Sequence, residues 1–229
     1  MRLPTRLLAL LMLLPVLTSP TAAAPAAARD WSKVAVRKPD GAFVQGNPAA
    51  KVKLVEYLSM TCPHCAKLEG EAIVPLTAKY VRTGLVSYEV RHALRDPFDF
   101  AASLLARCNG PLPAFSAIPA VYAQQTIWFD RAVKWSQTAP ADIPPDKVLP
   151  SVAAGAGLDT FFAAHGVPPA KAQACLADKA EQKLLSAMAD EAWKRPGFPG
   201  TPAFLINGTQ QDGIVTWADL DAKLAAALK

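Results

Sequence analysis

Residues 51–65, KVKLVEYLSMTCPHC, contain the local pattern that is most informative about the fold. Lys51 to Ser59 alternates in polarity and is rich in β-branched and aromatic side chains, which predicts a strand. Apolar residues then recur at helical spacing, so a helix is expected from Cys62 to about Val81, with a kink at Pro75. Because a second strand is predicted at Leu85–Ala93, the order is strand, helix, strand, and the two strands should be parallel.

The tetrapeptide Cys62-Pro63-His64-Cys65 places two thiols nearly one turn apart at the predicted helix start. Unpaired N–H groups and the helix dipole at that end favour negative charge, so the pKa of the Cys62 thiol should be low. Pro63 suits a first turn that needs no N–H from it, and His64 can add a donor or a charge. A stabilised thiolate stabilises the reduced dithiol and makes its disulfide a stronger oxidant.

Two other interpretations of the cysteine pair are a zinc half-site and a static disulfide. A zinc site needs a second Cys or His pair at short spacing, whereas Cys108, Cys175, His92 and His165 stand alone. A static disulfide across two residues would close almost no loop and gain little entropy. The favoured prediction is a redox-active disulfide with no metal and no organic cofactor.

The character of strands returns late in the chain. Ala203–Ile206 predicts a strand, Asn207-Gly208 is a strong hairpin signal, and Gly213–Thr216 is the expected second strand. A final helix is predicted from Trp217 to Leu228. From about residue 97 to 194 the chain is alanine-rich and helical in period, with breaks at Pro and Gly that predict four to six helices.

A second motif, Gly200-Thr201-Pro202-Ala203-Phe204, precedes the late strand. Together, VKLVEYLSMTCPHC, the helical insertion, GTPAFLING and the C-terminal helix resemble the DsbA-like branch of the thioredoxin superfamily. The resemblance covers most of the chain after residue 28. It implies an α/β thioredoxin fold in which a large helical insertion, approximately residues 97–194, separates a βαβ half from a ββα half. Residues 29–229 would form this single domain.

The resemblance also implies roles for individual residues. It places a cis peptide bond before Pro202 and packs that loop against the cysteine pair, leaving the Thr201 backbone free to pair with an extended substrate. It places an acidic residue at Glu56, which burial beneath the disulfide would make a proton acceptor for Cys65. Arg91 on the neighbouring strand is a candidate partner of Glu56. The alternative is a Glu56 that faces solvent at a sheet edge.

Four cysteines allow three pairings, and their spacing favours Cys62–Cys65 together with Cys108–Cys175. Related exported proteins of the DsbA-like branch can carry a second disulfide in the helical part. Closing a loop of that size would stabilise the fold by about 4 kcal/mol. The alternative is a pair of buried free cysteines.

Residues 1–28 predict an export signal. Arg2 and Arg6 precede the apolar run Leu7–Leu17, and an alanine-rich stretch ends at Ala28, with cleavage expected after Ala23, Ala24 or Ala28. The run is shorter than the roughly 20 residues that a permanent membrane span needs. The expected product is a soluble periplasmic protein; an uncleaved N-terminal helix is the alternative.

The charge of the chain argues against nucleic acid as a partner. Without Arg2 and Arg6 the formal net charge falls from +5 to +3, and no basic stripe with interleaved aromatics is present. The run Lys179–Lys183 is expected to be a solvated helix face. A short strand is expected at Val34–Val36.

The functional hypothesis is a periplasmic thiol–disulfide oxidoreductase that donates its Cys62–Cys65 disulfide to reduced or unfolded exported proteins. A membrane oxidase of the DsbB kind would recycle it, as the resemblance implies. One alternative is an isomerase or reductase kept reduced by a membrane partner. The short segment before the first strand leaves no room for the dimerisation domain of such isomerases, so a monomer is expected, although Thr201 replaces the valine typical of the archetypal oxidase. The other alternative is a chaperone or binding protein with an incidental cysteine pair.

Overall fold

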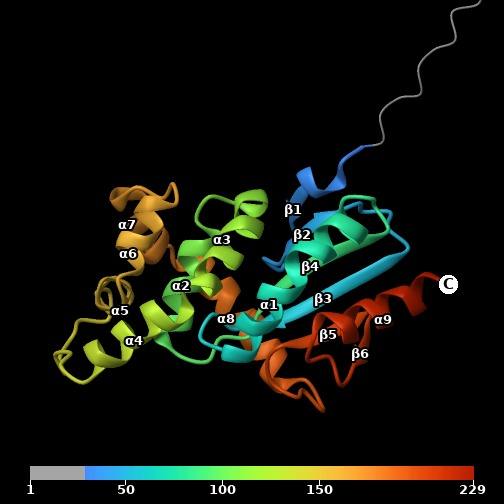
Figure 1. Cartoon of the computed structure of the whole chain (residues 1–229). Coiled ribbons are helices and arrows are strands. Elements are labelled where there is room, and N and C mark those ends of the chain that lie inside the picture. Colours follow the sequence, from blue (N-terminus) through green and yellow to red (C-terminus); the bar gives the residue numbers. More distant parts are fainter. Residues whose placement is uncertain (1–28) are drawn as a thin grey trace, which may run out of the picture.

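The computed structural model describes residues 29–229, and the predicted signal peptide, residues 1–28, lies outside this part of the chain. A six-stranded mixed sheet and a group of helices lie side by side (Figure 1). Within residues 29–229, no helix combines the length and the apolar character needed to cross a bilayer.

The sheet has the strand order β1-β2-β4-β3-β5-β6, in which β3 and β4 are parallel and the other neighbours antiparallel. The central strand β3 pairs with β4 on one side and with β5 on the other, so it joins parts of the chain that the helical insertion separates. The strand bounds are β1 Ala35–Arg37, β2 Phe43–Gly46, β3 Val52–Leu58, β4 Val86–His92, β5 Ala203–Ile206 and β6 Thr209–Gln211.

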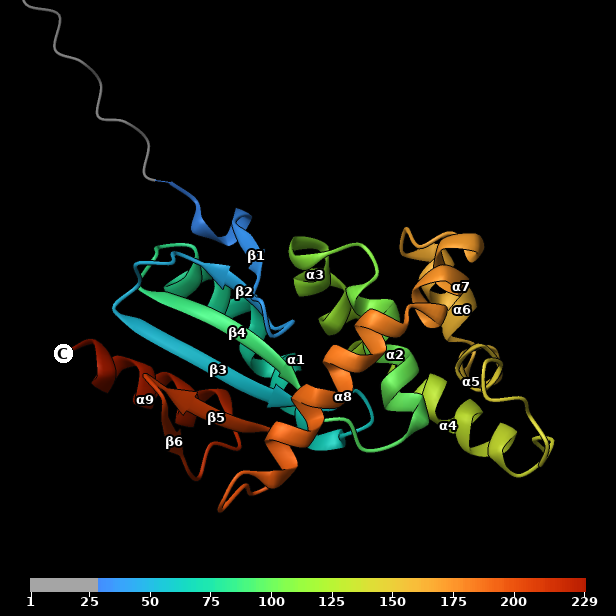
Figure 2. The ribbon, with the colours of Figure 1, turned by 180° about the vertical axis from the view of Figure 1, so that it is seen from behind.

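The two faces of β3 are covered differently, because successive side chains alternate between them. Leu54 and Leu58 belong to the main core, which includes residues of α1 (Pro63–Leu76) and α9 (Trp217–Leu228). Tyr57 belongs to a smaller cluster on the opposite face. Helix α8 (Lys179–Lys194) crosses that face near one end of the sheet (Figure 2). The main core therefore lies on the α1 side, where the cysteine pair also lies.

The predicted strand–helix–strand unit is confirmed with small changes at its boundaries. The helix expected to run to Val81 ends as an α-helix at Leu76, one residue after Pro75, and continues as a π-helical turn over Thr77–Val81. Proline removes one hydrogen bond from the helical ladder, which accounts for a change of helix type at this place.

The prediction of the last hairpin is correct in its first strand and turn but wrong in its second strand. Asn207 and Gly208 both have positive φ, as a two-residue hairpin turn requires, so pairing resumes at once with Ile206 opposite Thr209. The strand is therefore Thr209–Gln211, and Gly213–Thr216 is not a strand. The strand β2 was not predicted, because its four residues are held by pairing with the distant β4.

The helical insertion contains seven helices, more than the four to six predicted. Two boundaries, at Gln124 and Asp178, lack the Gly or Pro on which the prediction relied; Asp178 caps the helix after it through its side chain. The helices are α2 Pro97–Arg107, α3 Pro111–Ala123, α4 Gln125–Ser136, α5 Val148–Ala156, α6 Leu158–Ala164, α7 Pro169–Ala177 and α8 Lys179–Lys194.

The prediction of a solvated face at Lys179–Lys183 is wrong for Glu181, which is buried. Its carboxylate pairs with Arg107 at 2.7 Å and also with Arg37. Arg107 donates to the carbonyl of Gly41 at 2.6 Å, between β1 and β2. A buried charge needs such partners, and here they connect the insertion to the edge of the sheet.

The insertion is also held by a covalent bond. Cys108, at the end of α2, and Cys175, in α7, form a disulfide with 5.7 Å between their Cα atoms and 67 residues of sequence separation. Cys62 and Cys65 are free thiols.

Replacing both Cys108 and Cys175 with alanine should lower the free energy of unfolding of the oxidised protein by about 4 kcal/mol, because the unfolded chain regains the freedom that the closed loop removes. Urea unfolding measures this loss. The matched control, Cys62→Ala with Cys65→Ala, removes a pair that closes almost no loop. An unchanged unfolding midpoint in the Cys108/Cys175 variant would contradict the structural role.

Candidate active site

The cysteine pair lies where β3 passes into α1. Cys62 is the N-cap of α1, with extended backbone (φ −82°, ψ 118°), and Pro63 is the first helical residue. Both are buried, but 2 % of Cys62 is exposed and none of Cys65, so only Cys62 has any surface open to solvent. The two side chains can therefore take different chemical roles.

The electrostatics divide the pair further. The pKa of Cys62 is lowered to about 5, chiefly because the Cys65 thiol hydrogen-bonds to its sulfur. Hydrogen bonds from the Thr201 side chain and from the backbone N–H groups of Cys65 and His64 lower it further, whereas burial acts in the opposite direction. Burial raises the pKa of Cys65, and the neighbouring Cys62 raises it further. His64 has an exposed side chain and acts on Cys62 through its backbone N–H. At neutral pH the reduced pair holds its negative charge on Cys62.

The loop before β5 covers this sulfur. The peptide bond between Thr201 and Pro202 is cis, and the Cys62 thiol donates to the carbonyl of Thr201 at 3.1 Å. The structure thus brings Thr201 and Pro202, which are distant in sequence, to the cysteine pair. A cavity of about 410 Å³ opens beside them, lined by His64, Lys67, Thr201, Pro202, Ile214 and Val215.

Glu56 is buried within β3, on the face that α1 covers. Burial, together with the charge of Cys62, raises the pKa of Glu56 to about 7, although the Tyr88 hydroxyl donates to its carboxylate. The solvent-facing alternative for Glu56 is therefore wrong. A carboxyl that gains and loses its proton near neutral pH suits proton transfer with Cys65.

The predicted Glu56–Arg91 pair is wrong. Arg91 lies opposite Tyr57 in the β3–β4 register, so its side chain points to the other face of the sheet from Glu56. It pairs there with Asp40 and Glu89 at 2.8 Å each. The two strands are adjacent as predicted, but Arg91 and Glu56 lie on opposite faces of the sheet.

Two acidic residues near the site were missed in the sequence. Glu69 lies four residues after Cys65, a spacing that places both on one face of α1, and burial with the charge of Glu56 raises its pKa. Asp99 is fully buried and accepts from the Met60 N–H at 2.8 Å, two residues before Cys62. The helical spacing could have indicated Glu69, whereas Asp99 comes from the insertion and has no local signal. Within residues 29–229, no group of three acidic, His or Cys side chains could hold a metal ion.

A thioredoxin sheet with a helical insertion, a Cys-Pro-His-Cys helix start and a facing cis-proline loop define a DsbA-like thioredoxin-fold protein. The chain belongs to the thioredoxin family, whose model matches residues 38–226. It is similar to the crystal structure of a protein-disulfide isomerase from Novosphingobium aromaticivorans, with 32% identity and a TM-score of 0.75 over 83% of this chain and 98% of that one. Wolbachia pipientis alpha-DsbA1, 21% identical, shares the fold with a TM-score of 0.64 over 81% of this chain and 89% of that one.

Curated relatives include a putative protein-disulfide oxidoreductase of Rickettsia bellii, 29% identical over 79% of this chain and 62% of that protein. A similarly named protein of Rickettsia felis is 30% identical over 78% of this chain and 57% of that protein. The chain thus spans less than two thirds of these relatives. The comparisons confirm the predicted fold class and the resemblance to DsbA-like proteins.

Titration of the reduced protein should show one thiolate with a midpoint near pH 5, followed by its ultraviolet absorbance. The folded pKa lies below the ordinary 9.0, so the thiolate stabilises the folded reduced protein fully above pH 9, and this stabilisation is lost as the pH falls through about 5. The stability advantage of the reduced protein over Cys62→Ser should therefore grow between pH 5 and pH 9. A constant difference, or a midpoint near 9, would be the contrary result.

Glu56→Gln should slow thiol–disulfide exchange by roughly 10- to 100-fold, because the amide cannot take or give a proton. The variant should remain folded, since an amide can still accept from Tyr88. Its reduced form should also lose the decline in stability that a buried carboxyl imposes as the pH rises from 4.5 through about 7. Stopped-flow fluorescence and urea unfolding measure the two effects. Glu71→Gln, on the exposed side of α1, is the control, and equal rates in both variants would exclude proton transfer by Glu56.

Proposed function

We propose that this protein is a thiol–disulfide oxidoreductase that donates the Cys62–Cys65 disulfide to protein thiols. The observation that carries the proposal is the stabilised Cys62 thiolate at the start of α1, with Cys65 buried behind it. Such a thiolate stabilises the reduced enzyme, so that transfer of its disulfide to a substrate dithiol is favourable.

In the first step a substrate thiolate attacks the Cys62 sulfur. The bond between Cys62 and Cys65 breaks, and a mixed disulfide forms between Cys62 and the substrate. Cys65 is a poor leaving group because its pKa is raised, so it needs a proton as it leaves. The buried carboxyl of Glu56, whose pKa is about 7, is the group that supplies it.

In the second step another substrate thiolate attacks the substrate sulfur of the mixed disulfide. The bond to Cys62 breaks, and Cys62 leaves as the thiolate that the helix start stabilises. The substrate loses two electrons and gains a disulfide, and the enzyme is left as a dithiol. Thr201, whose carbonyl lies at the Cys62 sulfur, presents backbone to which an extended substrate segment can bind.

The proposed setting is the periplasm, where reduced or unfolded exported proteins are the substrates and a DsbB-like membrane oxidase restores the disulfide. The n-, h- and c-region pattern of residues 1–28 supports export, and exported compartments allow disulfides to persist. We propose a soluble monomer without a bound cofactor.

A second candidate function is disulfide isomerisation or reduction. Thr201 before Pro202 supports it, as does the similarity to a structure described as a protein-disulfide isomerase. The third candidate function is that of a chaperone with an incidental cysteine pair. In that case a Cys62→Ser, Cys65→Ser variant should keep full function.

Equilibration with glutathione, followed by tryptophan fluorescence, should give a reduction potential well above about −220 mV. The physical reason is the preference of the reduced state for the Cys62 thiolate. The Cys108→Ala, Cys175→Ala variant should keep the same potential, which assigns the signal to Cys62 and Cys65. A value near the about −270 mV of thioredoxin would reverse the proposed direction of electron flow and favour the reductase or isomerase.

A further inference from the structure

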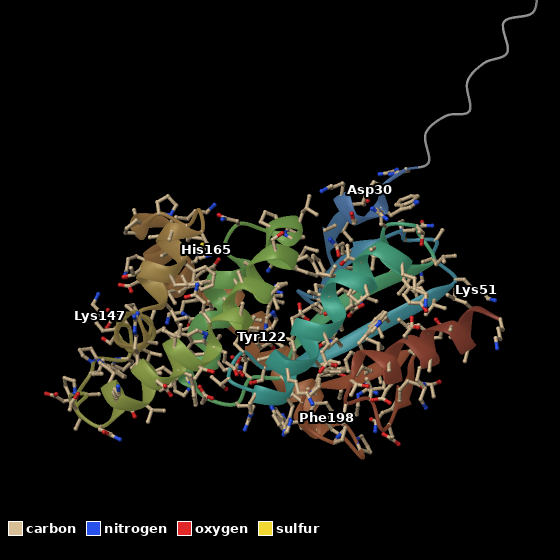
Figure 3. All side chains as sticks on the ribbon, viewed as in Figure 1. Asp30, Lys51, Tyr122, Lys147, His165 and Phe198 are labelled. Atoms are coloured by element: carbon tan, nitrogen blue, oxygen red, sulfur yellow. A yellow bond between two sulfur atoms is a disulfide. The ribbon has the colours of Figure 1, made fainter. Side chains whose placement is uncertain are left out.

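The turn that joins β3 to α1 is held by side chains of the helical insertion. The Tyr122 hydroxyl donates to the carbonyl of Ser59 at 2.9 Å, and Asp99 accepts from the N–H of Met60. Figure 3 shows Tyr122 where the insertion meets the sheet half. Groups remote in sequence thus bind the backbone immediately before Cys62.

Gln125 makes the closest of these contacts to the redox site. Its side-chain amide donates to the carbonyl of Met60 at 2.7 Å and to the carbonyl of Cys62 at 3.0 Å. Gln125 is the first residue of α4, and only 9 % of it is exposed. One buried NH₂ group therefore binds the carbonyls on both sides of Thr61.

We propose that Gln125 is a positioning residue for the redox chemistry of Cys62, holding the start of α1 so that the N–H groups of His64 and Cys65 point at the Cys62 sulfur. The proposal rests on dithiol–disulfide exchange at this pair and not on the direction of electron flow.

The physical argument begins with the buried carbonyl of Met60. Met60 is fully buried, so without Gln125 its carbonyl would lose its donor where water cannot replace it, at a cost that favours rotation of the turn. Cys62 follows two residues later as the N-cap, and its backbone angles decide whether the first-turn N–H groups face its sulfur.

The thiolate is the state that depends most on this geometry. The N–H groups of His64 and Cys65 both lower the pKa of Cys62, whereas a neutral sulfur in a disulfide gains little from them. Loss of the hydrogen bonds that hold the turn before Cys62 should therefore destabilise the reduced form more than the oxidised form. Through Gln125, the insertion would therefore change the reduction potential of the Cys62–Cys65 pair.

The experiment compares Gln125→Leu, which keeps the approximate size without a donor, with Gln125→Glu, which places an acceptor against both carbonyls. Loss of one hydrogen-bonding group should raise the midpoint of the Cys62 thiolate titration by about half a unit to one unit in Gln125→Leu. The equilibrium with glutathione should shift toward the enzyme disulfide by about 3- to 10-fold. Gln125→Glu should shift both quantities further in the same direction.

The matched control is Gln124→Leu, which changes the exposed preceding residue and should leave both quantities unchanged. A structural role alone would lower the melting temperature of Gln125→Leu while its titration midpoint and glutathione equilibrium stayed at the wild-type values, and that result would overturn the proposal. A wild-type midpoint near 9 would instead contradict the proposed function, so the two failures are distinguishable.

A measurement on the wild-type protein covers the case in which Gln125→Leu does not fold. The side-chain amide signals of Gln125 in nuclear magnetic resonance should resist exchange with solvent and should shift with the Cys62 midpoint. Amide signals that exchange freely and ignore the titration would overturn the proposal as well.

Discussion

The structure of the site depends on one interaction, the stabilisation of a sulfur anion by the start of a helix. Cys62 caps α1, Pro63 begins it, and Cys65 donates from within its first turn. The position of that helix start follows from β3, which ends four residues earlier beside two paired strands. The sheet thus fixes where the charge develops, and the carbonyl of Thr201 in the neighbouring loop lies 3.1 Å from this sulfur.

The same charge organises the acids around it. Burial and the charge of Cys62 raise the pKa of Glu56, and burial with the charge of Glu56 raises that of Glu69. Glu56 and Glu69 are both buried, so adjacent anions would repel more strongly there than in water. Proton uptake by Glu56 and ionisation of Cys62 are therefore linked, which gives a physical reason for a buried carboxyl beside a dithiol.

The helical insertion contributes more than a cover. The Arg37–Glu181 ion pair and the hydrogen bond from Arg107 to the Gly41 carbonyl join it to the edge of the sheet, and the Cys108–Cys175 disulfide ties α2 to α7 within it. These bonds hold the insertion in place, and Gln125 can orient the start of α1 only from a fixed position. Distant parts of the chain thereby act on one sulfur atom.

Local signals in the sequence were enough to predict the strand before Cys62, the helix start, the Asn207-Gly208 turn and the fold class that these imply. Alternation, helical period and capping are set by residues close together in the chain. The tertiary structure alone decided that Glu56 contacts Tyr88 and not Arg91, that Glu181 is buried, and that Gln125 binds the active-site turn. Each of these contacts depends on how segments distant in the sequence pack against one another, and local sequence patterns do not predict that packing.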